Sequence, residues 1–201
     1  VLAGRRGGVG CTLFALSGHR RVEFGLLLLG SRRVGVAAEF DRWRCARADL
    51  QPGVLGRQVA HRALDAAGVE VSSLLPLFRW SGPDEDERQA AVRYWRRSIE
   101  IAAELGVTRM NSEFNGRPES PSISEGQFWK SLEELLPVFE SNGVSLALEP
   151  HPDDFIEDGI TAVNMIRGVN SPNVSFLYCA PHTFHQGGNM AEIMRTAGDL
   201  L

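Results

Sequence analysis

The chain has 201 residues, of which 43% are hydrophobic and 23% are charged, and its formal net charge is −4. This composition is typical of a globular protein with enough apolar material for one core. Uninterrupted apolar runs such as Leu26–Leu29 are far shorter than the roughly 20 residues of a membrane-spanning helix, which excludes a transmembrane protein. Cys11, Cys45 and Cys179 are too scattered for a disulfide framework or a CxxC zinc site, so a reducing, cytoplasmic location is expected.

The charge is unevenly distributed along the chain. Residues 1–62 hold 11 arginines and four acidic residues, for a net charge of +7, whereas residues 63–201 carry a net charge of −11. A basic segment is compatible with nucleic-acid binding, but this one lacks the interleaved aromatic residues of a base-stacking surface. Lys130 is the only lysine against 20 arginines, which indicates a coding bias. Nucleic acid is therefore not an expected partner.

A repeating pattern predicts the secondary structure. The pairs Gly68-Val69, Gly106-Val107, Gly143-Val144 and Asn173-Val174 each join an amphipathic segment to an apolar run, and the valines are spaced by 38, 37 and 30 residues. Gly or Asn at these points favours a left-handed helix cap before a strand. We predict strands at about 9–16, 22–24, 69–77, 107–110, 144–148 and 174–178. Helices are predicted over 57–67, 85–105, 124–141 and 190–201, and residues 25–56 have no readable pattern.

Two helix starts carry specific signals. Four acidic residues, Asp84–Glu87, stand where the helix macrodipole favours negative charge. Ser124 followed by Gln127 has the pattern of a capping box that opens the helix over 124–141.

The alternation of helix and strand predicts an α/β fold with a parallel sheet. Its period of roughly 30 to 38 residues matches the unit of a (β/α)8 TIM barrel. About six of the eight strands of a closed barrel can be counted, and two more units would need roughly 70 further residues. We therefore expect a single, incomplete barrel domain over residues 1–201. Residues 57–201 form its clear units, and residues 1–56 match poorly.

Polar residues follow the predicted strands, where a parallel barrel builds its reaction site. Glu149 ends an otherwise apolar strand, and His182 and His185 follow the next strand. Carboxylate and imidazole together are suited to a divalent cation. A buried Glu149 without a cation would be costly, although an arginine on a neighbouring strand is an alternative partner. For the two histidines, the alternative is capping of the helix that begins near Asn189, or packing below the site.

Further residues at the same edge have the chemistry to bind a sugar. Prolines flank His151, Asp153 and Asp154, and such a rigid loop suits hydroxyl recognition, with a turn cap as the alternative. Trp80 could form an apolar floor for a sugar face or simply pack in the core. The remaining candidates are hydroxyl binders at Asn111, Glu113 and Asn115, for which turn formation at Asn115-Gly116 is the competing explanation.

The stretches Leu146–His151 (LALEPH) and Phe176–His185 (FLYCAPHTFH) resemble those of the xylose isomerase-like TIM barrels, the sugar phosphate isomerase/epimerase superfamily. The resemblance runs from about Gly68 to Leu201. In that family a Glu, an Asp, a His and a final Glu hold a divalent metal, often manganese. The resemblance puts Glu149 on the first ligand, Cys179 on the Asp position and His182 on a nearby substrate-binding His. The last two ligands would lie beyond Leu201.

From this resemblance, together with the carboxylate and imidazole chemistry of this edge, we expect a metal site of Glu149, Cys179 and His182. In the alternative, Cys179 is not a ligand and His182 or His185 takes its place. Mn²⁺ is the first expectation, while a Cys179 thiolate would suit Zn²⁺, and Mg²⁺ and Co²⁺ stay open. The residues implied for the substrate are His151, His182, His185, Trp80, Glu113, Asn115 and Asp154.

The activity implied is a sugar or polyol isomerase or epimerase that abstracts a proton next to a carbonyl through an enediolate. Glu149 would be a metal ligand and one acid/base carboxylate. The second carboxylate is expected beyond Leu201, so the 201-residue chain alone is expected to be inactive. A lyase or dehydratase, a C-glycoside-cleaving subunit and a non-catalytic degenerate barrel are alternatives. An endonuclease IV-like repair enzyme is disfavoured by the acidic charge. Phosphorylation of the substrate and homo-oligomerisation are left open.

Overall fold

The computed structural model describes residues 10–18, 21–28, 62, 70–185 and 187–201. The predicted helix over 57–67, apart from residue 62, and the predicted cap at Gly68 lie outside these residues. Six strands form one sheet in the order β2-β1-β3-β4-β5-β6. In chain order the strands are β1 (Gly10–Gly18), β2 (Arg21–Leu28), β3 (Glu70–Pro76), β4 (Arg109–Glu113), β5 (Ser145–Glu149) and β6 (Val174–Phe176).

The sheet is parallel except at one edge. Strand β1 pairs in parallel with β3, and β3, β4, β5 and β6 continue in parallel. Strand β2 runs antiparallel to β1, with Gly18 opposite Arg21 and Cys11 opposite Leu28. The expectation that this strand is parallel like the others is therefore wrong. Only two residues separate β1 from β2, and a parallel crossover needs a dozen or more, so the short link allows only a hairpin.

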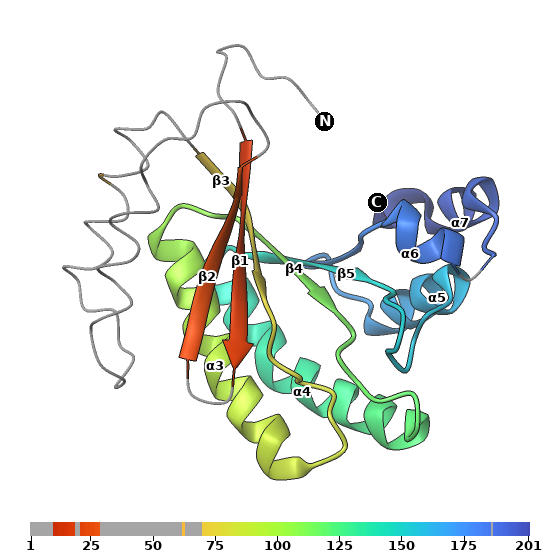
Figure 1. Cartoon of the computed structure of the whole chain (residues 1–201), viewed down its shortest axis with the longest axis horizontal. Helices are drawn as coiled ribbons and strands as arrows, with labels where there is room; N and C mark the ends of the chain where they lie inside the picture. Colours follow the sequence, from red (N-terminus) through yellow and green to blue (C-terminus); the bar gives the residue numbers. More distant parts are fainter. Residues whose placement is uncertain (1–9, 19–20, 29–61, 63–69, 186) are drawn as a thin grey trace.

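Helices follow strands β3 to β6, as the repeat predicts, and α3 and α4 lie along one side of the strands (Figure 1). The helices are α3 (Glu85–Glu104), α4 (Pro121–Asn142), α5 (Gly159–Val169), α6 (Ala180–His185) and α7 (Met190–Ala197), followed by the short 3-10 helix η1 (Gly198–Leu200). The sequence pattern did not predict α6. Its six residues were expected to form a loop. A helix of fewer than two turns is too short to show helical periodicity in the sequence.

The helix ends follow the expected capping rules with two corrections. Asp84 caps α3 by accepting a hydrogen bond from the backbone N–H of Glu87 at 2.9 Å, and Gly143 ends α4 in the left-handed conformation. The capping box at Ser124 is wrong, because α4 already begins at Pro121 and proline suits the first helical position. The left-handed residue after α5 is Asn170, not Asn173.

The core lies between the sheet and helices α3 and α4. The predicted apolar faces of both helices are buried, and aromatic rings dominate the packing. Trp80 lies 5.4 Å from Trp95 and 5.6 Å from Phe128 between ring centroids, and Phe139 contacts Trp95. Fully buried strand residues complete this core, namely Met110, Leu146 and Leu148. Burial therefore fixes which face of β4 and β5 points toward the helices.

The opposite face of these strands carries the polar side chains. Because side chains alternate along a strand, Asn111 and Glu113 on β4 share the face away from Met110, and Ala147 and Glu149 on β5 do the same. The amide of Asn111 donates a hydrogen bond to the Ser73 hydroxyl on β3 at 3.1 Å. This face thus carries Asn111 and Ser73, and its carboxyl edge ends in two glutamates.

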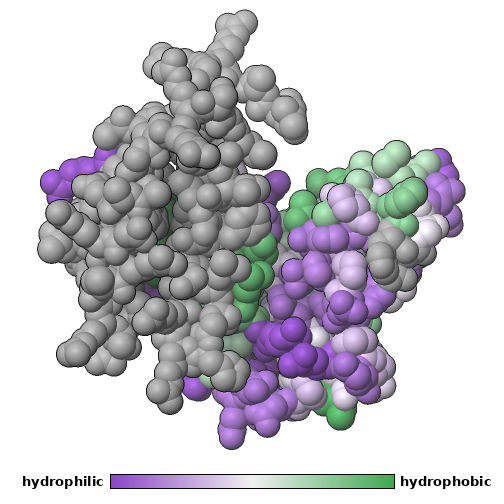
Figure 2. All heavy atoms as spheres, in the orientation of Figure 1, coloured by the Kyte–Doolittle hydropathy of each residue, from purple (hydrophilic) through white to green (hydrophobic). Residues whose placement is uncertain are grey.

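The end of the molecule formed by α6 and α7 exposes apolar side chains, and hydrophobic surface gathers there in Figure 2. Large apolar residues that are exposed in this region are Phe184, Met190, Met194 and Leu201. In the part of the chain that the structure describes, none of the helices has the length and apolar character needed to cross a membrane.

Candidate metal centre

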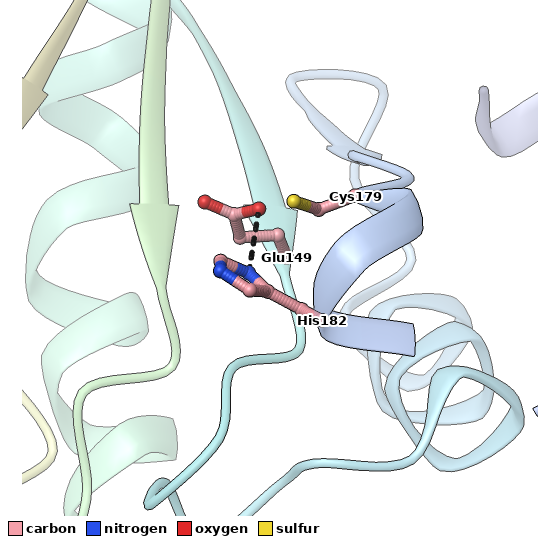
Figure 3. Close-up of side chains that lie close together, drawn as sticks. All are labelled: Glu149, Cys179 and His182. Atoms are coloured by element: carbon pink, nitrogen blue, oxygen red, sulfur yellow. Dashed lines mark ion pairs between the residues drawn. The ribbon is translucent and has the colours of Figure 1, made fainter. Parts of the chain in front are cut away.

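Three side chains with metal-binding atoms converge at the carboxyl edge of the sheet. Glu149 is the last residue of β5, Cys179 lies three residues beyond β6, and His182 lies on α6. In Figure 3 the carboxylate, the thiol and the imidazole point toward one another. Their candidate ligand atoms all lie within 4.8 Å of one another. These are the three residues predicted from the sequence as metal ligands.

The topology explains this convergence. Strands β5 and β6 are parallel neighbours, so the residues after them meet at one edge. The turn into α6 is held by Thr183, whose backbone N–H and hydroxyl both donate to the Cys179 carbonyl oxygen, at 3.1 and 3.0 Å. Thr183 is buried, and it was not predicted from the sequence. Its position four residues after Cys179 is the signal that could have identified it, because threonine commonly bonds back to that carbonyl.

Glu149 is a buried carboxylate in contact with ionisable neighbours. It is 9% exposed, and its Oε2 lies 3.6 Å from Nδ1 of His182. Burial raises the pKa of the Glu149 carboxyl, and the nearby Glu113 carboxylate raises it further. The Cys179 thiol, which donates a hydrogen bond to it, and the imidazoles of His182 and His151 lower this pKa. Among ion pairs of the described residues, Glu149 is joined to a histidine and not to an arginine.

Cys179 is a free thiol on the other side of the cluster. Burial raises the pKa of the Cys179 thiol, and the Glu149 carboxylate beside it raises this pKa further, while the backbone N–H of His182 lowers it. The protonated thiol is therefore the stable form next to the carboxylate when no cation is present. A bound cation would reverse this balance, because a coordinating thiol is deprotonated.

His182 supplies a test of whether a metal fits. Its Nδ1 is buried and has no hydrogen-bond partner among the described residues. Buried polar atoms almost always have a partner, and this nitrogen faces the Glu149 carboxylate. A divalent cation between oxygen, nitrogen and sulfur donors would satisfy it. The residues present therefore fit a metal ion.

A second pair of ionisable residues borders the cluster. Nε2 of His151 lies 3.5 Å from Oε1 of Glu113, and the His151 ring meets the His182 ring edge-on with centroids 4.2 Å apart. Nδ1 of His151 lies 2.7 Å from the Pro152 carbonyl oxygen, which can only accept, so this nitrogen carries a proton. Two predicted substrate residues, His151 and Glu113, thus lie beside the candidate metal ligands.

Asp154 and Asn115 have their polar groups occupied within the protein. The Asp154 carboxylate accepts from the backbone N–H groups of Asn115, Gly116 and Phe155, at 2.5, 2.7 and 2.7 Å. Burial raises the pKa of the Asp154 carboxyl, and these three hydrogen bonds oppose the rise. Asn115 has a left-handed backbone with φ of 61°, and its amide donates to Ser112 and to the Glu113 carbonyl. These contacts match the turn alternative for both residues.

One other predicted substrate residue, Trp80, does not reach the cluster, and for His185 the structure gives no test. Trp80 is fully buried, and its indole N–H donates to the Glu113 carbonyl oxygen at 3.3 Å. Trp80 therefore packs in the core, which was the alternative to a sugar-binding role, and it supports the backbone that carries Glu113. His185 ends α6, but its side chain lies outside the described residues.

The fold agrees with comparisons to known proteins. Residues 34–201 match the family model of the xylose isomerase-like TIM barrel, a match that starts well before Gly68. Similar solved structures include D-psicose 3-epimerase with D-tagatose from Clostridium cellulolyticum H10, with a TM-score of 0.65 and 18% identity over 73% of this chain and 55% of that one. No curated protein matches significantly.

Two further solved structures share the fold. IOLI protein with a bound zinc atom has a TM-score of 0.63 and 18% identity over 80% of this chain and 56% of that one. The 3-keto-D-glucoside 4-epimerase YcjR from E. coli has a TM-score of 0.62 and 18% identity over 74% and 62%. The chain spans little more than half the length of these relatives. It belongs to the xylose isomerase-like TIM barrel family.

Proposed function

We propose that this chain carries the metal-binding part of a divalent-metal-dependent isomerase or epimerase that acts on a sugar or polyol with a carbonyl group. The observation that carries the proposal is the cluster of Glu149, Cys179 and His182, whose ligand atoms lie within 4.8 Å of one another. Support comes from relatives that are named as epimerases of D-psicose and of a 3-keto-D-glucoside. A free thiol at the site is compatible with the reducing cytoplasm.

Glu149, Cys179 and His182 would hold the metal. When bound, it supplies Lewis-acid polarisation of a substrate carbonyl, which makes the neighbouring C–H more acidic. The three protein ligands leave coordination positions for substrate oxygens, as catalytic sites require.

Glu149 is the group that would move the proton. A carboxylate is the kind of group that removes a proton from carbon in such a reaction, and Glu149 ends β5 at the edge where the substrate would bind. The proton passes from the carbon next to the carbonyl to a Glu149 oxygen, the C–H electron pair forms a carbon–carbon double bond, and the carbonyl π electrons move onto the carbonyl oxygen to give an enediolate. Return of a proton to the opposite face of the same carbon gives an epimer, and return to the neighbouring carbon gives an isomer.

His151 and Glu113 would bind substrate hydroxyl groups beside this carboxylate. Both side chains are partly exposed and lie at the same edge as Glu149. A carboxylate accepts a hydrogen bond from a hydroxyl, and an imidazole can donate or accept one. The pair would orient the carbon that loses its proton.

The test is proton exchange with solvent. The metal-loaded whole protein would be incubated with ketoses such as D-fructose and D-tagatose in deuterated water, and deuterium at the carbon next to the carbonyl would be measured by NMR. We expect incorporation that Glu149→Gln lowers by at least about 100-fold, while Glu125→Gln, an exposed change on α4, leaves it unchanged. Metal binding without exchange in any ketose or ketose phosphate would contradict the proposal, and an elimination product would assign a lyase instead.

A further inference from the structure

We infer that Cys179 is a thiolate ligand that makes the metal centre selective for zinc and similar thiophilic cations over manganese and magnesium. This inference rests on the metal centre of the proposed function and adds the identity of the cation. It concerns the one ligand position at which the chain departs from the oxygen donor that the family resemblance implies.

The first argument is the position of the sulfur. Sγ of Cys179 lies with the Glu149 carboxylate and the His182 imidazole in a group whose ligand atoms are all within 4.8 Å. Ligands of one zinc ion, at about 2.0 to 2.3 Å from the metal, lie roughly 3 to 4 Å from one another. Nδ1 of His182 and Oε2 of Glu149 are already 3.6 Å apart. Only a small movement of the thiol is therefore needed.

The second argument is that the sulfur is held at the site. Thr183 fixes the Cys179 carbonyl with two hydrogen bonds, and the backbone N–H of His182 faces the sulfur. A cysteine that served only to fill space would not need to point at a carboxylate and an unpartnered imidazole nitrogen. This nitrogen has no hydrogen-bond partner among the described residues and lies 3.6 Å from the Glu149 carboxylate, an observation that does not depend on the cysteine and that a shared cation would explain.

The third argument is the chemistry of the donor set. One sulfur, one nitrogen and one carboxylate oxygen are the donors that zinc accepts in three-ligand sites. Magnesium and manganese favour oxygen donors, and thiolate favours softer cations. Exchange of a carboxylate for a thiolate therefore shifts the preference of the site away from manganese, the first expectation from the resemblance.

Binding would convert the thiol into a ligand by a balanced step. Without a cation, the Cys179 S–H donates a hydrogen bond to the Glu149 carboxylate. When a divalent cation binds, the S–H bond breaks, its proton passes to solvent, and the sulfur electron pair forms the bond to the metal. The Glu149 oxygen that accepted the hydrogen bond becomes free to bind the same cation.

The experiment uses cobalt as a spectroscopic probe of the ligand. The purified whole protein is freed of metal and titrated with Co²⁺, and near-ultraviolet absorption is recorded, where a thiolate bound to cobalt gives a charge-transfer band. The variants are Cys179→Ser, Cys179→Asp and, as a matched control, the double variant Cys11→Ser with Cys45→Ser. Zinc and manganese affinities of the wild type and Cys179→Asp are measured by competition with a chelator.

We expect the charge-transfer band in the wild type and in the double variant, and no band in either Cys179 variant. We also expect Cys179→Asp to lower the ratio of zinc affinity to manganese affinity by at least about tenfold. Cobalt bound without the band, a band that survives Cys179→Ser, or an unchanged affinity ratio would overturn the inference and leave the proposed isomerase intact. A wild type that binds neither cobalt nor zinc would overturn both.

Discussion

Glu113 and Glu149 lie opposite each other in the register of β4 and β5, and each carboxylate faces a different histidine. Like charges at the ends of neighbouring strands repel, and this repulsion adds to the cost of burying Glu149. The two imidazoles offset part of the cost. The two glutamates at the edge of the sheet would therefore be stabilised by a positive charge beyond what the two histidines supply.

This arrangement predicts that Glu149→Gln stabilises the metal-free protein. The folded pKa of the Glu149 carboxyl is raised above its unfolded value of 4.5, so its contribution to stability is present below pH 4.5 and is lost as the pH rises through the folded pKa. At pH 7 the variant should be more stable by about 0.5 to 2 kcal/mol in urea unfolding. Zinc at 100 times its Kd should stabilise only the wild type, by about 2.7 kcal/mol. Equal stabilisation of the wild type and Glu149→Gln by zinc would refute the role of Glu149 as a metal ligand.

Asp154→Asn should destabilise the protein by roughly 2 to 4 kcal/mol, because an amide cannot accept all three backbone hydrogen bonds at a buried position. The free energy of unfolding in urea measures the loss. Asp153→Asn is the control, since this neighbour is exposed and has a left-handed backbone that Asn tolerates. The control should stay within about 0.5 kcal/mol of the wild type. Similar losses in both variants would show that the three hydrogen bonds contribute little.

Gly116→Ala should be strongly destabilising, while Gly126→Ala should stabilise. A Cβ at Gly116 would lie 2.2 Å from a ring carbon of Phe155 and 2.7 Å from the Ser124 Cβ, whereas a Cβ at Gly126 meets nothing within 4 Å. Overpacking typically costs about 1 to 3 kcal/mol, and alanine in a helix gains about 1 kcal/mol over glycine. Thermal unfolding of the two variants should therefore shift in opposite directions, and equal shifts would contradict the packing of this loop.

Arg88→Lys should cost roughly 2 kcal/mol although it keeps the charge. Arg88 is buried and donates to Glu85 at 2.7 Å, to Glu134 at 2.9 Å and to Ser131 at 3.0 Å. Lysine cannot reproduce the fork of the guanidinium. Arg93→Lys on the same helix is exposed and should change the unfolding free energy little. A loss in the Arg93 variant as large as that in the Arg88 variant would argue against this network.

The same network predicts an acid-dependent loss of stability. Hydrogen bonds from Arg88 and Gln89 lower the pKa of Glu85 from 4.5 to about 2. Glu85 therefore contributes stability above pH 4.5 that is lost as the pH falls through about 2. The difference in unfolding free energy between the wild type and Glu85→Gln should shrink between pH 6 and pH 3. The same difference for Glu125→Gln should stay flat, and parallel curves would disprove the assignment.

Local patterns predicted most of the described elements. Strands β3 to β6 were found from valine-led apolar runs, and Gly106 and Gly143 adopt the expected left-handed conformation because a side chain is disfavoured there. The convergence of Glu149, Cys179 and His182 followed from one rule, that residues after parallel strands meet at one edge. Their assignment as ligands came from the family resemblance and stays a prediction.

What the sequence could not predict depends on contacts between distant residues. The amides that bind Asp154 lie 38 and 39 residues earlier in the chain, so no local pattern distinguishes this residue from exposed Asp153. The sequence likewise leaves Trp80 as a candidate for sugar binding, and only the contacts with Trp95 and Phe128 in the folded protein show that it is a core residue. The direction of β2 depended on a two-residue link rather than on its apolar pattern.

The Asp154 carboxylate joins the loop after β4 to the loop after β5. Moving either loop away from the other breaks the hydrogen bonds from Asn115 and Gly116 to this side chain. Backbone amide protons of Asn115 and Gly116 should therefore exchange with solvent through a shared opening event and at similar rates. The loops after β4 and β5 should thus open as one cooperative unit, and a substrate would bind at a site whose two loops move together.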